Sequence, residues 1–202
     1  MNSRSGCNQN VSNVVQKWLC ACALALVLNA SSFGQTLPSP VAPEAAASDA
    51  RQLAVLVGGI VSYTRWPQPP NPIRICILGR DDIVETLRTG TAASSSRPIT
   101  VHGIKAGVDF KSQCDVVYVT AIPPENARLL LLKTVMAPIV TIGEGQEFCS
   151  DGGMFCVTQG AGATAKDVKL KFSVNLDVVS RSGLQINPRV LLLAKPAGVI
   201  AQ

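Results

Sequence analysis

The segment from residue 170 to 183 constrains the fold most, because the spacing of its apolar residues changes midway. Between Leu170 and Val174 every second residue is apolar, which predicts a strand with one buried face. After Asn175 the spacing becomes helical. The Asn175 side chain can accept a hydrogen bond from the first free N–H groups of that helix, and Gly183 can end it in the left-handed conformation. A strand that leads directly into a short capped helix is typical of a layered domain.

Strand and helix patterns alternate through most of the chain, so we expect an α/β domain. Its largely parallel sheet is flanked by helices, with a small antiparallel hairpin region near the last two cysteines. Residues 115–120 are almost wholly apolar, as in a central strand covered on both faces. Helices are expected at residues 49–63, from 81 or 82 to about 89, and at 123–135 and 187–194. Strands are expected at residues 73–79, 99–104, 115–120, 138–142, 155–158 and 168–174.

Two adjacent glycines, Gly58 and Gly59, lie in the middle of the first expected helix. Each glycine costs about 1 kcal/mol relative to alanine in a helix interior. Either another backbone approaches the helix closely at this point, or the helix is kinked there.

The first 34 residues have the features of a cleaved signal peptide. Arg4 and Lys17 precede an apolar run at residues 18–28, which is shorter than the roughly 20 residues that span a bilayer. We expect cleavage before Gln35. A lipoprotein-like cysteine, Cys22, stands at the start of the apolar run rather than after it, which argues against lipidation. The sequence therefore predicts an exported protein.

The remaining chain divides into a tether and one domain. Residues 35–47 are rich in proline and alanine, which suits a tether, and residues 48–202 are enough for a single domain with one core. Without Arg4 and Lys17 the chain has 16 basic and 13 acidic residues, a net charge of +3. Because this mild charge is not clustered, the sequence does not favour nucleic-acid binding.

Four cysteines follow the signal peptide: Cys76, Cys114, Cys149 and Cys156. An even number in an exported chain indicates disulfides, for which three pairings can be drawn. A local bridge from Cys149 to Cys156, across an Asp-Gly-Gly turn, is the simplest, and it leaves Cys76 for Cys114.

The sequence offers little for catalysis or cofactor binding. It has a single histidine, His102, and lacks phosphate-loop, nucleophile-elbow and zinc-protease motifs. The cysteine spacing is that of neither a zinc site nor a redox dithiol. We therefore expect no catalytic residue, no metal site and no cofactor.

The residues best suited to recognition lie where the first helix ends. Tyr63, Arg65 and Trp66 precede a rigid proline-rich turn, and aromatic and arginine side chains dominate binding hot spots. The alternative is that Tyr63 and Trp66 fill the core. Asp177 and Arg181, four residues apart on one expected helix, are most simply a surface ion pair.

Three segments of the sequence resemble the YfiR family of small exported proteins of Gram-negative bacteria. These are GIVSYTRWP at residues 59–67, FSVNLDVVSRSG at 172–183 and INPRVLLLA at 186–194. The four cysteines also fall where that family places its pairs. The resemblance extends from about Gln52 to Lys195.

The resemblance implies a dimeric, non-enzymatic periplasmic repressor whose cysteines form redox-sensitive disulfides. Its partners would be the periplasmic domain of a YfiN-type membrane diguanylate cyclase, which it holds inactive, and a YfiB-type outer-membrane lipoprotein, which sequesters it. Lower cyclic di-GMP would reduce exopolysaccharide and biofilm. The residues that we expect to contact a partner or ligand are Tyr63, Arg65, Trp66, Asn175, Asp177 and Arg181.

Two other functions remain open from the sequence. One is a periplasmic small-molecule sensor, with a pocket at the carboxyl ends of the strands. The other is a disulfide-linked redox enzyme, which thiol turnover by the purified protein would reveal.

Overall fold

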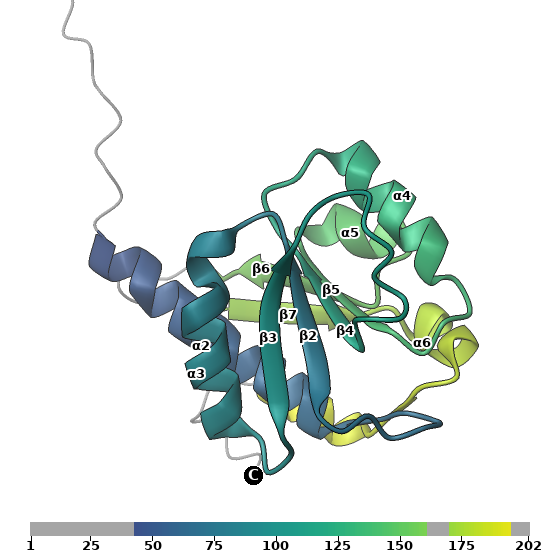
Figure 1. Cartoon of the computed structure of the whole chain (residues 1–202), viewed down its shortest axis with the longest axis horizontal. Helices are drawn as coiled ribbons and strands as arrows, with labels where there is room; N and C mark the ends of the chain where they lie inside the picture. The colour runs from purple at the N-terminus through teal and green to yellow at the C-terminus, as the bar shows by residue number, and fades with distance from the viewer. Residues whose placement is uncertain (1–42, 161–169, 195–202) are drawn as a thin grey trace, which may run out of the picture. The chain divides into compact units, whose positions relative to one another are not determined.

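The computed structural model of the chain describes residues 43–160 and 170–194. Six strands form one sheet in the order β3-β2-β4-β5-β6-β7, in which β7 alone runs antiparallel to its neighbour (Figure 1). The expected α/β class and the largely parallel sheet are thus confirmed. The strands are β2 (Ile73–Leu78), β3 (Ile99–Ile104), β4 (Val116–Val119), β5 (Val140–Glu144), β6 (Phe155–Gln159) and β7 (Leu170–Val174).

Helices connect the strands, mostly where the sequence predicts them. The helix expected from 81 or 82 to about 89 extends to Ser94, and the short helix Gln146–Ser150 was not predicted. The helices are α2 (Pro43–Ser62), α3 (Val84–Ser94) after the 3-10 turn η1 (Asp81–Ile83), α4 (Pro124–Thr134), α5 (Gln146–Ser150), α6 (Leu176–Ser182) and the 3-10 helix η2 (Pro188–Ala194). In the described part of the chain, no helix combines the length and the apolar character that a membrane crossing needs.

The first helix differs from the prediction at its start. It begins at Pro43 instead of near Asp49, so residues 43–47, which the composition assigned to the tether, are helical. A proline fits the first turn of a helix because its missing N–H would have no partner there, and the alanines that follow are strong helix formers. The predicted signal peptide and the start of the strand expected at 168–174 lie outside the described residues.

Alternate residues of the central strands enter two separate cores. Ile75 and Ile77 of β2 pack in the core beneath α2 and α3, whereas Cys76 and Leu78 pack in the core beneath α4 and α5. Figure 1 shows these helix pairs on opposite sides of the sheet. β4 is buried along its whole length, as its apolar sequence predicts.

The order of the strands creates a switch point between β2 and β4. The chain leaves β2 for β3 on one side and returns to β4 on the other. In doubly wound sheets with this order, the loops at the carboxyl ends of such neighbours diverge and leave a crevice that commonly binds ligands.

Antiparallel pairing occurs in two places. The expected one joins β6 to β7, next to the second cysteine pair. The other is a short ribbon of β1 (Thr64–Arg65) and β8 (Gln185–Ile186), which the sequence patterns do not reveal because each strand has only two residues.

The paired glycines of α2 lie at close contacts with neighbouring elements. Of the two interpretations that the sequence allowed, close approach or a kink, the structure supports close approach. A Cβ on Gly58 would lie 2.7 Å from Ser94 Cβ and 3.4 Å from Thr91 Cα of α3, whereas one on Gly59 would meet the methyl end of Leu193.

We expect Gly58→Ala to destabilise the fold by about 1–2 kcal/mol, since two helices must separate. Gly59→Ala should be near neutral, because Leu193 can rotate and the helix gains propensity.

Urea unfolding of the two variants measures this difference. Equal stability of the two variants, or a more stable Gly58→Ala, would contradict the close packing of α2 on α3.

Candidate functional site

The ribbon of β1 and β8 brings together the two sequence blocks that we expect to face a partner. Arg65 lies opposite Gln185 in the ribbon, and the N–H of Asn187 donates to the Tyr63 carbonyl at 2.9 Å. Two residues separate the end of α6 from the start of β8. A Cβ on Gly183, at the end of α6, would lie only 3.8 Å from Pro67. The corner at residues 63–67 therefore adjoins the carboxyl end of α6.

The aromatic residues of this corner belong mainly to the core. Trp66 is only 6% exposed, and the Arg97 guanidinium lies 5.5 Å from the centroid of its ring, within cation–π range. Tyr63 is half-buried against the same core. Arg65 is exposed, so it is the residue of the three best placed to meet a partner.

Asn175 has a structural role that connects three segments. Its Oδ1 accepts from Val178 N–H at 3.2 Å and caps α6, as predicted. Its side-chain amide donates to the Cys149 carbonyl at 3.0 Å, and its backbone N–H donates to the Met154 carbonyl at 2.9 Å. Asn175 thus ties α6 to the loop that the second disulfide closes.

The remaining two predicted residues lie on the surface of α6. Asp177 and Arg181 form the expected ion pair, in which both side chains are more than half exposed. Such a pair contributes less than about 1 kcal/mol to stability. Its charges are consequently available to a binding partner.

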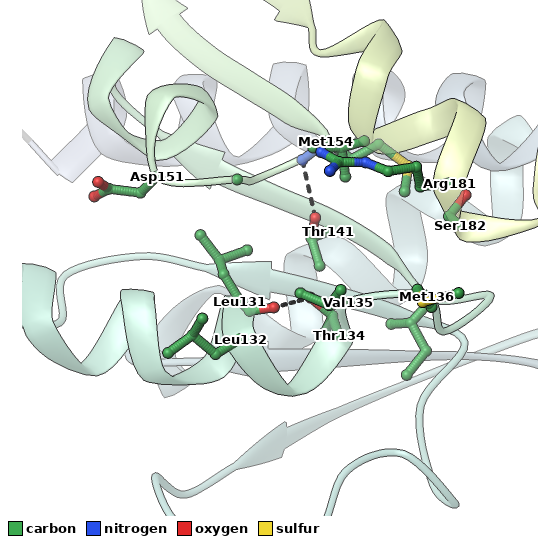
Figure 2. A pocket seen from close by; sticks show the side chains of 13 residues that line it. Leu131, Leu132, Thr134, Val135, Met136, Thr141, Asp151, Met154, Arg181 and Ser182 are labelled. Atoms are coloured by element: carbon green, nitrogen blue, oxygen red, sulfur yellow. Dashed lines mark hydrogen bonds between the residues drawn. The ribbon is translucent and has the colours of Figure 1, made fainter.

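A small cavity lies between α6 and the end of α4 (Figure 2). Arg181 and Ser182 line it from α6, and Leu131 lines it from α4. Its volume is about 100 Å³, well below the roughly 300 Å³ at which drug-sized ligand pockets begin. The cavity is therefore a hollow in a surface rather than a pocket for a large ligand.

The rim of this hollow is unusually apolar. Leu132 is 70%, Val135 61% and Met136 78% exposed. Met136 also has φ of +59°, a left-handed conformation that residues other than glycine seldom adopt and that clusters at functional surfaces. We call these three residues together with Arg181 the α4–α6 surface. Exposed apolar residues in one area indicate an interaction site.

A second candidate site is a cleft at the carboxyl ends of the strands, where the switch point predicts one. Its volume is about 510 Å³, and it lies among Asp49, Ala50, Leu53, Arg80, Ile83, Tyr118, Glu144, Gly145, Val157, Thr158, Gln159 and Leu170. Glu144 Oε1 accepts from the Tyr118 hydroxyl at 2.7 Å and from the Thr120 hydroxyl at 2.8 Å. Two donors thus fix the position of this carboxylate.

The described lining of the cleft carries more acidic than basic side chains. The Arg80 guanidinium donates to Asp82 at 3.1 and 2.6 Å, which raises the pKa of Arg80 and lowers the pKa of Asp82. Asp49 and Glu144 add two acidic groups to the lining. Because Asp82 offsets Arg80, the one cationic side chain among the described residues of the lining, the cleft suits a positively charged group.

Sequence reasoning placed a pocket at the carboxyl ends of the strands but named none of its residues, although a signal for them was present. Arg80 and Glu144 stand at or just after the carboxyl ends of two predicted parallel strands, and Tyr118 is the one phenol in an otherwise apolar central strand. Polar residues at those places converge on one edge of a parallel sheet.

The four cysteines form the two pairs that the local-bridge pairing gives. Cys76 and Cys114 have their Cα atoms 5.8 Å apart, and Cys149 and Cys156 5.7 Å apart, both ordinary disulfide separations. The first bridge ties β2 to the segment before β4, and the second ties α5 to β6. His102, which the sequence left without a partner, lies with Nε2 3.3 Å from Cys76 Sγ.

The Tyr118 hydroxyl yields a prediction about alkaline pH. Burial, and then the Glu144 charge, raise the pKa of Tyr118 well above its usual value of about 10. The folded state therefore keeps Tyr118 neutral while the unfolded chain ionises above pH 10. At pH 7, Tyr118→Phe should lower the free energy of unfolding by about 1–2 kcal/mol, since a hydrogen bond to a carboxylate is lost.

Above pH 10 the difference between Tyr118→Phe and the wild type should shrink, because only the wild type loses stability through this hydroxyl. Urea unfolding of both proteins at pH 7 and above pH 10 measures the difference in free energy of unfolding. The contributions of other titrating groups are shared by both proteins and cancel in this difference. A difference that is constant with pH would contradict the buried hydroxyl.

The fold and these surfaces define a disulfide-bridged α/β domain with an exposed apolar surface and a cleft. The YfiR/HmsC-like family model matches residues 51–195, and the chain belongs to that family. The family is a regulatory, non-catalytic one, and membership supports a role for this chain as a regulator in cyclic di-GMP signalling.

Proposed function

We propose that the protein is a periplasmic repressor that binds the periplasmic domain of a YfiN-type membrane diguanylate cyclase and holds the enzyme inactive. The observation that carries this proposal is the pairing of β1 with β8. It joins two segments more than 100 residues apart into one ribbon, in which Arg65 lies opposite Gln185, three residues after the end of α6.

The chemistry of this region suits a protein partner. Arg65 is exposed beside a rigid aromatic corner, and Met136 and Leu132 expose apolar area next to Arg181. Arginine, methionine and aromatic residues are enriched at protein interfaces. The α4–α6 surface would supply apolar contact, and Arg65 and Arg181 would supply charge.

Repression then depends on differential affinity. A bound protein shifts the cyclase only as far as it binds the inactive state more tightly than the active one. A surface fixed before binding loses little entropy on association. Two disulfides and the Asn175 hydrogen bonds support such fixation here.

The location and the other partners belong to the same proposal. The two disulfides are typical of proteins in an oxidising compartment, and the predicted signal peptide is consistent with export. A YfiB-type outer-membrane lipoprotein would compete for the repressor and free the cyclase. We propose a homodimer as the functional form.

Charge reversal at Arg65 tests the proposed interface. We expect Arg65→Glu to weaken binding to the cyclase's periplasmic domain by more than about tenfold, since hot-spot residues commonly cost about 2 kcal/mol or more. The matched control is Lys105→Glu, which reverses an exposed charge just beyond β3. β3 is the edge strand opposite β7, the strand that leads into α6.

Calorimetry or surface plasmon resonance on folded, oxidised proteins measures the two affinities. Unchanged affinity of Arg65→Glu would remove the corner from the interface. An equal loss in Lys105→Glu would show that only overall charge matters.

A second candidate function, a small-molecule sensor, is favoured by the cleft at the carboxyl ends of the strands. The fixed Glu144 carboxylate, Asp49 and the apolar side chains of Leu53 and Ile83 together suit an organic amine with an apolar body. Its binding would stabilise the folded protein by mass action.

Thermal unfolding with a series of alkylamines tests this second function. We expect a rise in the melting temperature that increases with amine concentration and is lost in Glu144→Gln, which keeps the side-chain shape but not the charge. Glu125→Gln, on the exposed first turn of α4, is the control. No rise with any amine, or the same rise in both variants, would contradict the cleft as an amine site.

A further inference from the structure

A histidine side chain, that of His102, lies beside the Cys76–Cys114 bridge. Cys76 and His102 are partners in the parallel register of β2 and β3, so both side chains leave the sheet on the same face. Nε2 of His102 lies 3.3 Å from Cys76 Sγ. One ligand atom from each of Cys76, His102 and Cys114 lies within 4.8 Å of both others.

These distances are close to those around a tetrahedral zinc ion. With Zn–S of about 2.3 Å and Zn–N of about 2.0–2.1 Å, two ligand atoms in a tetrahedron are about 3.6 Å apart for nitrogen and sulfur and about 3.8 Å for two sulfurs. The His102–Cys76 separation already fits. The two sulfurs, bonded to each other in the oxidised protein, need to move apart by less than about 2 Å.

We propose that reduction of the Cys76–Cys114 disulfide creates a zinc site whose three protein ligands are Cys76, Cys114 and His102. Two thiolates with one imidazole form a known ligand set for zinc, in which a water or another small ligand takes the fourth position. His102 is half-buried on β3, one of the two edge strands of the sheet, which gives the ion a path from solvent.

The reaction has two balanced steps. A dithiol reductant gives two electrons and two protons to the disulfide, which becomes two thiols while the reductant becomes a disulfide. Zinc then binds the two thiolates and the neutral imidazole, and the two thiol protons leave to solvent. The oxidised protein keeps both sulfurs in the S–S bond and therefore offers no thiolates.

The structure around the ligands supports a site that forms without large rearrangement. β2 lies between β3 and β4, so Cys76 is fixed by pairing on both sides. The backbone N–H of Cys114 donates to the Phe110 carbonyl at 2.8 Å, which holds the segment before β4. Cys76 and Cys114 are buried, and thus sheltered from competing ligands.

Cobalt(II) titration of the full-length mature protein tests the proposal, because tetrahedral cobalt thiolates absorb in the visible range. After reduction and removal of metals, we expect one cobalt per chain, displaced by zinc, with loss of the visible bands. The oxidised protein should give no such bands. His102→Ala should weaken binding by more than about tenfold, since even a residue that only orients a ligand costs about 10–100-fold in affinity.

Cysteine variants separate the two bridges. Cys76→Ser with Cys114→Ser should abolish the bands, whereas Cys149→Ser with Cys156→Ser should keep them, because His102 is the only histidine in the chain and lies beside the first pair. Bands that persist without Cys76 and Cys114, or that are unaffected by His102→Ala, would overturn the proposal.

Circular dichroism gives a second readout if reduction loosens the fold. In that case zinc should restore the native spectrum of the reduced wild type but not that of His102→Ala, while both oxidised proteins have the same spectrum. Equal recovery in the two proteins, or no recovery in the wild type together with no cobalt bands, would also overturn the site.

Discussion

The three hydrogen bonds of Asn175 hold together the parts of the molecule on which the proposed recognition depends. This residue ends β7, caps α6 and fastens both to the carbonyls of Cys149 and Met154. Its amide uses donor and acceptor at once, so replacement by a residue with only one of these functions would leave a neighbouring polar group without its partner. The position of α6 is therefore set by a few directional bonds rather than by extensive burial, since most of its residues are exposed or half-buried.

That arrangement connects the Cys149–Cys156 disulfide to the proposed recognition surface. The Cys149–Cys156 bridge closes the turn between α5 and β6, and Asn175 holds the carbonyl of one bridged residue. A turn closed covalently has fewer conformations to lose when a partner binds. The Cys149–Cys156 bridge is thus connected to α6 through the Asn175 side chain, and this connection requires no movement of the sheet.

The sequence predicted what local periodicity determines, and it missed what long-range pairing determines. The strands, the Asn175 cap and the Gly183 helix end each follow from residues within one turn or strand, and the structure has all of them. The β1–β8 ribbon could not be found this way, because strands of two residues carry no period. The Glu144–Tyr118 pair and the His102–Cys76 contact were also missed, since each joins different strands and depends on sheet order.

The two disulfide bridges support different parts of the proposed interface. Cys76 and Cys114 lie in the core beneath α4, in the same cluster as Leu131, whose side chain also lines the hollow under the α4–α6 surface. The short bridge reaches α6 through Asn175. Because one bridge supports the α4 side of the hollow and the other the α6 side, opening either one would loosen a different half of the same surface. A partner that spans both helices would therefore bind most tightly when both bridges are closed.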